Sequence, residues 1–183
     1  VIKDAEGNDK TANFTNVTYV PGALTVNPKA VTITTGAASK PYDGTALTEG
    51  TATIGGLADG ESVKLTATGS QTEVGSSNNT YSITWDNADA NNYTVTENLG
   101  KLTVTENAVA VTLTAPSASK TYDGTALTKT DGVTATGLPA GFTVEATASG
   151  SQTDAGSSAN VVDDGYVIKD AEGNDKTANF TNV

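Results

Sequence analysis

The residues of this chain that could form a covalent crosslink are lysines and asparagines. Each half of the chain places a lysine early, an aspartate three residues later and an asparagine far downstream. An intramolecular Lys–Asn isopeptide bond needs a neutral amine and a protonated carboxyl group, so its three residues must be buried together. The alternative is that the lysines are solvated and the asparagines bond to backbone in turns. The candidate residues are Lys40, Asp43 and Asn92 in the first half, and Lys120, Asp123 and Asn179 in the second.

No other set of residues suggests catalysis. Histidine and cysteine are absent, which removes the commonest general base, the commonest metal ligand and any thiolate. A nucleophile would then need a Ser–Lys or carboxylate pair, and none stands out. We therefore expect no enzymatic activity and no cofactor.

Two acidic, asparagine-rich segments could present oxygen ligands to calcium. They are residues 86–91 and residues 170–175. Neither fits an EF-hand loop, because the glycine is misplaced or missing and no glutamate follows at the twelfth position. Solvated turns are the favoured interpretation, and a bound calcium ion is the alternative.

The single tryptophan could stack on a sugar or pack in a core. Tyr81, Ile83 and Trp85 alternate with Ser82 and Thr84, so the three large side chains share one face of an expected strand. Core packing is therefore favoured. A carbohydrate-binding module would show several exposed aromatics, whereas aromatic residues make up only 5% of this chain.

The charge and composition limit the partners. The net charge of −11 would repel phosphates, so no nucleic-acid partner is expected. No stretch approaches the roughly 20 apolar residues of a membrane-spanning helix, so no membrane insertion is expected in this segment. Hydrophobic residues make up 36%, which allows small, thin cores.

The chain is built from repeats. Residues 1–17 recur without change as residues 167–183. Within this period, SKPYDGTALT at 39–48 matches SKTYDGTALT at 119–128, and GSQTEVGSS at 69–77 matches GSQTDAGSS at 150–158. We therefore expect three parts: residues 1–29 as the C-terminal strands of a preceding B-type repeat, residues 30–107 as a complete repeat A, and residues 108–183 as a repeat B lacking its last strand.

Strand signals recur every 8–12 residues and are separated by Asp-Gly and Gly-Gly turns. This pattern predicts an all-β fold of tandem immunoglobulin-like β-sandwich modules. A β-grasp fold is the alternative, but it needs a helix and no window has a helical period. Repeat B is longer than repeat A around Glu172-Gly173-Asn174-Asp175, which predicts an extended hairpin there.

Three motifs, in the same order in both repeats, resemble a known family. They are Lys-x-Tyr-Asp-Gly-Thr, Gly-Ser-x-Thr-x-x-Gly and Asn-Tyr/Phe-Thr, the last followed by Gly-x-Leu-Thr-Val. Together they resemble the YDG/MBG-type tandem repeats of bacterial cell-surface adhesins. The resemblance implies an extracellular position on the bacterial surface, in a stalk between an adhesive tip and a cell-wall anchor.

The Tyr-Asp-Gly motifs at 42–44 and 122–124 are interpreted as turns rather than ligand sites. Aspartate can close an Asx-turn, and glycine adopts a positive φ at no steric cost. The tyrosine ring is expected to pack beneath its own turn.

The expected function is that of a structural stalk or spacer repeat that projects a distal binding domain. Joints between repeats are expected at residues 27–29 and 106–107, both too short for free swivelling. The alternative is a ligand-binding adhesin module that recognises a host glycan or protein.

The expected partners are neighbouring repeats of the same array. Residues 18–30, TYVPGALTVNPKA, carry the strand that repeat B is expected to need. An open sheet edge favours capture of such a strand from a neighbouring copy; the alternative, left open, is that these residues belong to a longer array in which the missing strand follows residue 183. Head-to-tail exchange of this kind does not close, so it would propagate as a fibre.

Overall fold

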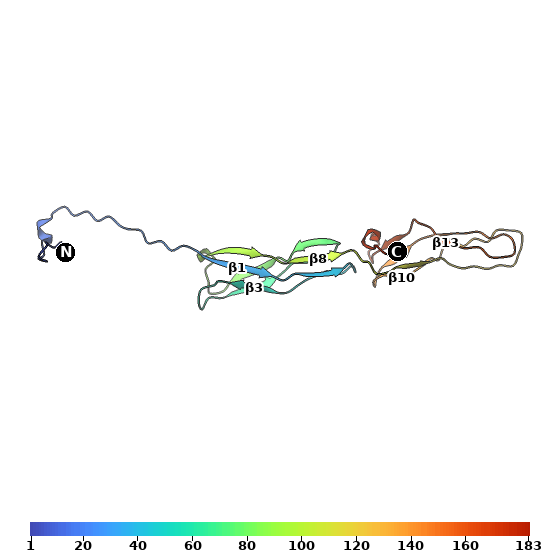
Figure 1. The fold of residues 1–183 in the computed structure, drawn as a ribbon, viewed down its shortest axis with the longest axis horizontal. Helices are drawn as coiled ribbons and strands as arrows, with labels where there is room; N and C mark the ends of the chain where they lie inside the picture. The colour runs from blue at the N-terminus through green and yellow to red at the C-terminus, as the bar shows by residue number, and fades with distance from the viewer.

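The computed structural model describes all 183 residues and is strongly elongated, with the two repeats end to end (Figure 1). The N-terminal segment extends away from one end of repeat A. Repeat B follows at the other end of repeat A, and the C-terminus lies back at the junction of the two repeats.

Repeat A consists of eight strands in three small sheets. The sheet orders are β3-β1-β7, β2-β8-β5 and β4-β6. The strands are β1 (Lys29–Thr35), β2 (Ala38–Pro41), β3 (Ala52–Gly55), β4 (Val63–Ala67), β5 (Gly75–Asn78), β6 (Tyr81–Trp85), β7 (Tyr93–Asn98) and β8 (Lys101–Thr105).

The first and last strands of repeat A run parallel along its whole length. Strand β1 pairs with β7 from Lys29↔Tyr93 onward, and β2 continues the pairing with β8 up to Pro41↔Thr105. Both long segments are interrupted at the same level, where a Cβ on Gly100 would lie 2.2 Å from the carbonyl oxygen of Gly36. Only glycine allows this approach of the two backbones.

Repeat B follows the same strand order with shorter strands. They are β9 (Thr112–Thr114), β10 (Thr134–Thr136), β11 (Thr143–Glu145), β12 (Ala148–Ser149), β13 (Val161–Val162) and β14 (Val167–Lys169). Strand β9 pairs with β10 as β1 pairs with β3, and Ala148↔Val162 repeats the pair Ala67↔Tyr81.

The all-β prediction is confirmed. Helical structure is limited to three 3-10 turns of three residues each, η1 (Thr11–Asn13), η2 (Ala90–Asn92) and η3 (Thr177–Asn179). The helix that a β-grasp needs does not form. No helix in the structure is long and apolar enough to span a membrane.

The two repeats differ at the strands that flank β8 in repeat A. In repeat A, β8 lies between β2 and β5. In repeat B the residues that match β2 and β5, 118–121 and 156–159, form no strand. The far end of repeat B therefore consists of long loops (Figure 1).

The extra length of repeat B forms the expected hairpin. Lys169 pairs with Asp175, and the side chain of Asp170 accepts a hydrogen bond from the backbone N–H of Asn174 at 2.8 Å. The identical residues near the N-terminus repeat this bond, from Asn8 N–H to Asp4, also at 2.8 Å. The same turn forms in two different surroundings, so the local sequence specifies it.

The expected alternation along β6 is confirmed, with Tyr81, Ile83 and Trp85 half-buried and the residues between them exposed. Trp85 stacks on Tyr93, with ring centroids 5.4 Å apart and planes 19° apart. Only 14 of the 183 residues are buried, so the stability of each repeat depends on few side chains.

Candidate functional site: the joint between the repeats

The Tyr-Asp-Gly segments form the Asx-turns that the sequence predicts. The Asp43 carboxylate accepts hydrogen bonds from the N–H (2.9 Å) and hydroxyl (2.8 Å) of Thr45, and Gly44 has φ +79°. The ammonium group of Lys40 lies 2.7 Å from the same carboxylate. Its hydrogen bond, together with those from Thr45, lowers the pKa of Asp43 to about 2.

The tyrosine of the first motif does not pack beneath its own turn, and that prediction is wrong. Tyr42 is 1% exposed because its ring lies against repeat B. It makes edge-to-face contacts with Phe142 at 5.8 Å and Phe180 at 6.0 Å. A Cβ on Gly44 would lie 2.9 Å from the Phe142 ring, so this glycine also allows the ring to approach.

The joint has a continuous hydrophobic core drawn from both repeats. Repeat A contributes Tyr42 and Val104, and repeat B contributes Val111, Ile168 and Phe180. Burial raises the pKa of the Tyr42 phenol above its ordinary value. Edge-to-face aromatic contacts add about 0.5–1.5 kcal/mol each beyond the area they bury.

Hydrogen bonds fix the linker at the same place. The side-chain amide of buried Asn107 donates to the carbonyl of Tyr42 at 2.9 Å. The backbone of Asn107 donates to Asn179 at 2.8 Å and accepts from Thr181 at 3.0 Å. Asn107, which the sequence predicts to lie at a joint, thus forms hydrogen bonds with both repeats.

An ion pair closes the rim of the joint. Lys176 of repeat B lies 2.7 Å from Glu73 of repeat A, and this hydrogen bond raises the pKa of Lys176. Because Glu73 is well exposed, the pair contributes less to stability than the buried aromatic cluster.

The second Tyr-Asp-Gly motif forms the same turn, but its tyrosine does not pack against another repeat. The Asp123 carboxylate accepts from the N–H of Thr125 at 2.9 Å, and its pKa is lowered chiefly by the hydrogen bond from Lys120. Tyr122, the counterpart of Tyr42, is 64% exposed. The turn is therefore local, and burial of the tyrosine requires a following repeat.

One segment of the chain matches a known family. Residues 27–100 match the family model of the YDG domain. The matched segment runs from the start of β1 through β7 and includes the Tyr42 turn. No curated protein and no solved structure matches the chain.

In the YDG domain, the three candidate crosslink residues do not lie together. Lys40 and Asp43 form a half-exposed ion pair, whereas Asn92 is exposed and lies beside the start of β1, next to the Lys29↔Tyr93 pair. Lys40 lies in β2, roughly 35 Å further along the strand direction. Asp43 is moreover ionised rather than protonated. The YDG domain thus lacks the arrangement that isopeptide chemistry needs.

Repeat B lacks this arrangement as well. Lys120 and Asp123 form a partly exposed ion pair at 2.8 Å, in the turn of repeat B that corresponds to the Tyr42 turn of repeat A. Asn179 lies at the joint, where its carbonyl accepts from Asn107.

The acidic segments considered for calcium use their oxygen atoms within the protein. Asp89 caps η2 by accepting from the N–H of Asn91 at 2.9 Å, and Asn87 accepts from the N–H of Ser62 at 2.7 Å. Asp170 closes the hairpin turn of repeat B. No group of three or more acidic side chains lies close enough to share a metal ion.

Sequence reasoning missed Tyr42 as a contact between repeats. One signal was present: two of the three phenylalanines in the chain, Phe142 and Phe180, lie in repeat B and both contact Tyr42. At the position of Phe142 the YDG domain has Glu61, which accepts a hydrogen bond from the Tyr93 hydroxyl.

Proposed function

We propose that this chain is a structural spacer, a section of a stalk of tandem repeats in a bacterial cell-surface adhesin. In this proposal the stalk lies outside the cell, projects a distal binding domain and is held to the cell wall by another part of the protein. The observation that carries the proposal is the joint, in which Tyr42 of one repeat is buried in the next.

The joint supports a stiff connection rather than a flexible one. A flexible linker leaves its backbone groups to water, whereas Asn107 bonds to the repeats on both sides. Rotation about the linker would break these bonds and expose the Tyr42 ring. Stiff joints keep an array of repeats extended, so that each added residue increases its end-to-end length. A spacer needs this property.

The strand order of repeat A supports resistance to pulling. Its N-terminal strand begins at one end, its C-terminal strand finishes at the other, and the two are paired in parallel from Lys29 to Thr105. Tension along the chain therefore shears the two long strands past each other. Many cross-strand hydrogen bonds must then break together rather than one after another.

The composition fits a crowded, oxidising surface. The net charge of −11 makes neighbouring stalks repel one another, which opposes aggregation. With no cysteine, the stalk forms no unwanted disulfides.

The stiffness of the joint can be measured by double electron–electron resonance on the full chain. The chain has no cysteine, so Thr94→Cys in β7 and Thr134→Cys in β10, both exposed, give two unique labels. A stiff joint predicts one narrow distribution of label-to-label distances. The matched control is a short Gly-Ser insertion between Asn107 and Ala108, which should broaden the distribution. A broad distribution without the insertion would contradict the spacer proposal.

A further inference from the structure

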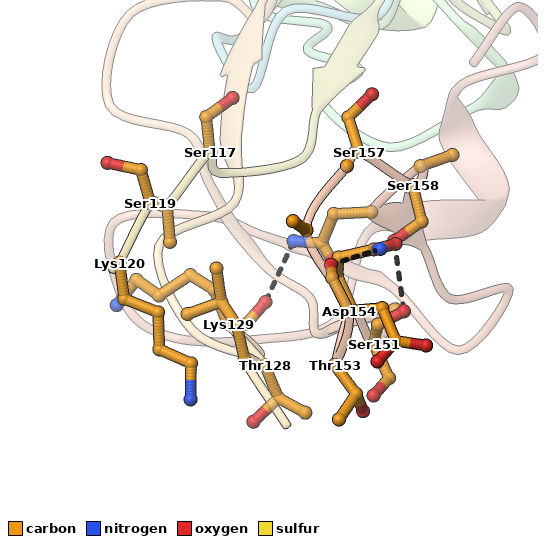
Figure 2. A pocket seen from close by; sticks show the side chains of 18 of the residues that line it. Ser117, Ser119, Lys120, Thr128, Lys129, Ser151, Thr153, Asp154, Ser157 and Ser158 are labelled. Carbon is orange, nitrogen blue, oxygen red and sulfur yellow. Dashed lines mark hydrogen bonds between the residues drawn. The ribbon is translucent and has the colours of Figure 1, made fainter. Parts of the chain in front are cut away.

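The turn that carries the tyrosine of the joint is nearly the same in both repeats. Residues 39–48 and 119–128 differ at one position, and both segments join a lysine, an aspartate and a threonine by hydrogen bonds. An acidic residue lies near each turn as well: Glu73 in repeat A, and Asp154 in repeat B, where it lines the same groove as Tyr122 (Figure 2). The tyrosine side of a joint therefore does not distinguish one repeat from the other.

The surface that receives the tyrosine differs between the repeats. Strand β11 pairs with β14 in repeat B as β4 pairs with β6 in repeat A. Val144 and Val63 hold the same place in these pairs, and two residues before them stand Phe142 and Glu61. Phe142 contacts the Tyr42 ring. The corresponding side chain of repeat A is a carboxylate.

The 3-10 turns mark two further positions at which the repeats differ. In repeat B, Lys176 precedes η3 and Phe180 follows it. In repeat A, Asp89 precedes η2 and Tyr93 follows it. Phe180 belongs to the core of the joint, and Lys176 forms the ion pair with Glu73 at 2.7 Å. Repeat A thus has a negative charge at the position where repeat B has a positive one.

The hairpin that lengthens repeat B holds this lysine in place. The backbone N–H of Lys176 donates to the carbonyl of Ile168 at 2.8 Å, and its ammonium group lies 3.9 Å from the carboxylate of Asp170 in the hairpin turn. The Lys176 side chain is only 18% exposed. The residues that repeat A lacks therefore direct a cation toward the acidic residue of the preceding repeat.

A second repeat A in the place of repeat B would bring unfavourable groups to the joint. The Tyr42 ring would meet the carboxylate of Glu61, which already accepts a hydrogen bond from the Tyr93 hydroxyl. Covering a carboxylate with an apolar ring removes its hydration, which is costly. At the rim, Asp89 would face Glu73, so that repulsion between like charges replaces the attraction of the ion pair.

We propose that the acceptor surface of repeat B, formed by Phe142, Phe180 and Lys176, determines which repeat can follow repeat A: repeat B fits and a second repeat A does not. An interface is selective when it combines favourable contacts to the right partner with repulsive contacts to the wrong one. Phe142 and Lys176 supply the first, and their counterparts Glu61 and Asp89 supply the second. The proposal rests on the stalk of tandem repeats proposed above, since selection matters only in an array.

Placing the side chain of repeat A in the joint tests the proposal. Phe142→Glu, in the chain labelled at Thr94→Cys and Thr134→Cys, should replace the narrow distance distribution by a broad one, because the carboxylate does not pack against the Tyr42 ring. Phe142→Leu is the matched control, which keeps an apolar side chain and should broaden the distribution much less. If Phe142→Glu gives a distribution as narrow as that of Phe142→Leu, the acceptor surface does not select and the proposal is overturned.

Charge reversal at the rim is a second test, and it leaves the aromatic core unchanged. Lys176→Asp should broaden the distribution, by less than Phe142→Glu because the ion pair is partly exposed. Adding Glu73→Lys should restore the narrow distribution, since the ion pair re-forms with its charges exchanged. Lys169→Asp makes the same change of charge but removes an ion pair within repeat B, with Glu145, so it should leave the distribution narrow. Equal distributions for Lys176→Asp and Lys169→Asp, or no restoration by Glu73→Lys, would contradict the role of Lys176.

The unchanged chain separates this proposal from the spacer function. A broad distribution in the unchanged chain contradicts the spacer. A narrow distribution both in the unchanged chain and in Phe142→Glu leaves the spacer standing and overturns only the selection of repeat B.

Discussion

Replacing Tyr42 with alanine is expected to destabilise repeat B by about 3–5 kcal/mol, the usual cost of truncating a large buried aromatic residue. The ring belongs to repeat A in sequence but packs against Phe142, Phe180 and Ile168 of repeat B. Hydrogen exchange followed by mass spectrometry should show faster exchange around β11, β14 and η3 than in the strands of repeat A.

Tyr122→Ala is the matched control for this prediction. It removes the same residue from the same motif, and Tyr122 is exposed, so the change in unfolding free energy should stay within about 0.5 kcal/mol. If the two variants have equal effects, or if Tyr42→Ala loosens only repeat A, the joint has a different role from the one described.

Asn79→Ala is expected to destabilise repeat A by at least about 3 kcal/mol. Asn79 is fully buried, and its side-chain amide donates to the carbonyls of Gly36 and Glu49, at 2.9 and 2.8 Å. Each buried polar group left without a partner costs about 1–3 kcal/mol. Urea unfolding followed by the fluorescence of Trp85, which lies in repeat A, measures the effect.

The neighbouring asparagine provides the control. Asn78 is exposed at the end of β5 and makes no side-chain hydrogen bond, so Asn78→Ala should change the unfolding free energy by no more than about 0.5 kcal/mol. Equal unfolding midpoints for the two variants would show that the Asn79 bonds do not hold the sheets together.

The local features of the fold could be predicted from the sequence. The alternation of Tyr81, Ile83 and Trp85 predicted one face of β6, and the Asp43-Gly44 pair predicted an Asx-turn. The Glu172–Asp175 turn forms in the same way near the N-terminus, because its hydrogen bonds lie within a few residues. Such features depend on neighbours along the chain, which the sequence displays directly.

The joint could not be predicted in the same way. The Tyr42 and Tyr122 motifs have nearly the same local sequence, yet one ring is buried and the other exposed. The difference comes from Phe142 and Phe180, which contact Tyr42 although they lie roughly 100 or more positions away from it in the chain. The parallel pairing of β1 with β7 was likewise missed, because the apolar pattern of a strand does not show which strand lies beside it or in which direction.

The sequence suggested a crosslink that the structure does not bring together, for a related reason. The order of Lys40 and Asn92 in the sequence says nothing of their separation, which the parallel strands make large. The lysine is instead neutralised by Asp43, three residues away.

The measurement that tests the account most directly is the force needed to unfold repeat A, pulled in two directions by optical tweezers. Attachment at the N-terminus and at Glu106→Cys loads β1–β2 against β7–β8 from opposite ends. Attachment at the N-terminus and at Asn92→Cys pulls from the end where Lys29 and Tyr93 are paired, so the strands separate one pair at a time. Forced unfolding reports the rate of unfolding under load. A spacer built to resist tension predicts a clearly higher unfolding force in the first direction than in the second. Equal forces, or a lower force in the first direction, would contradict it.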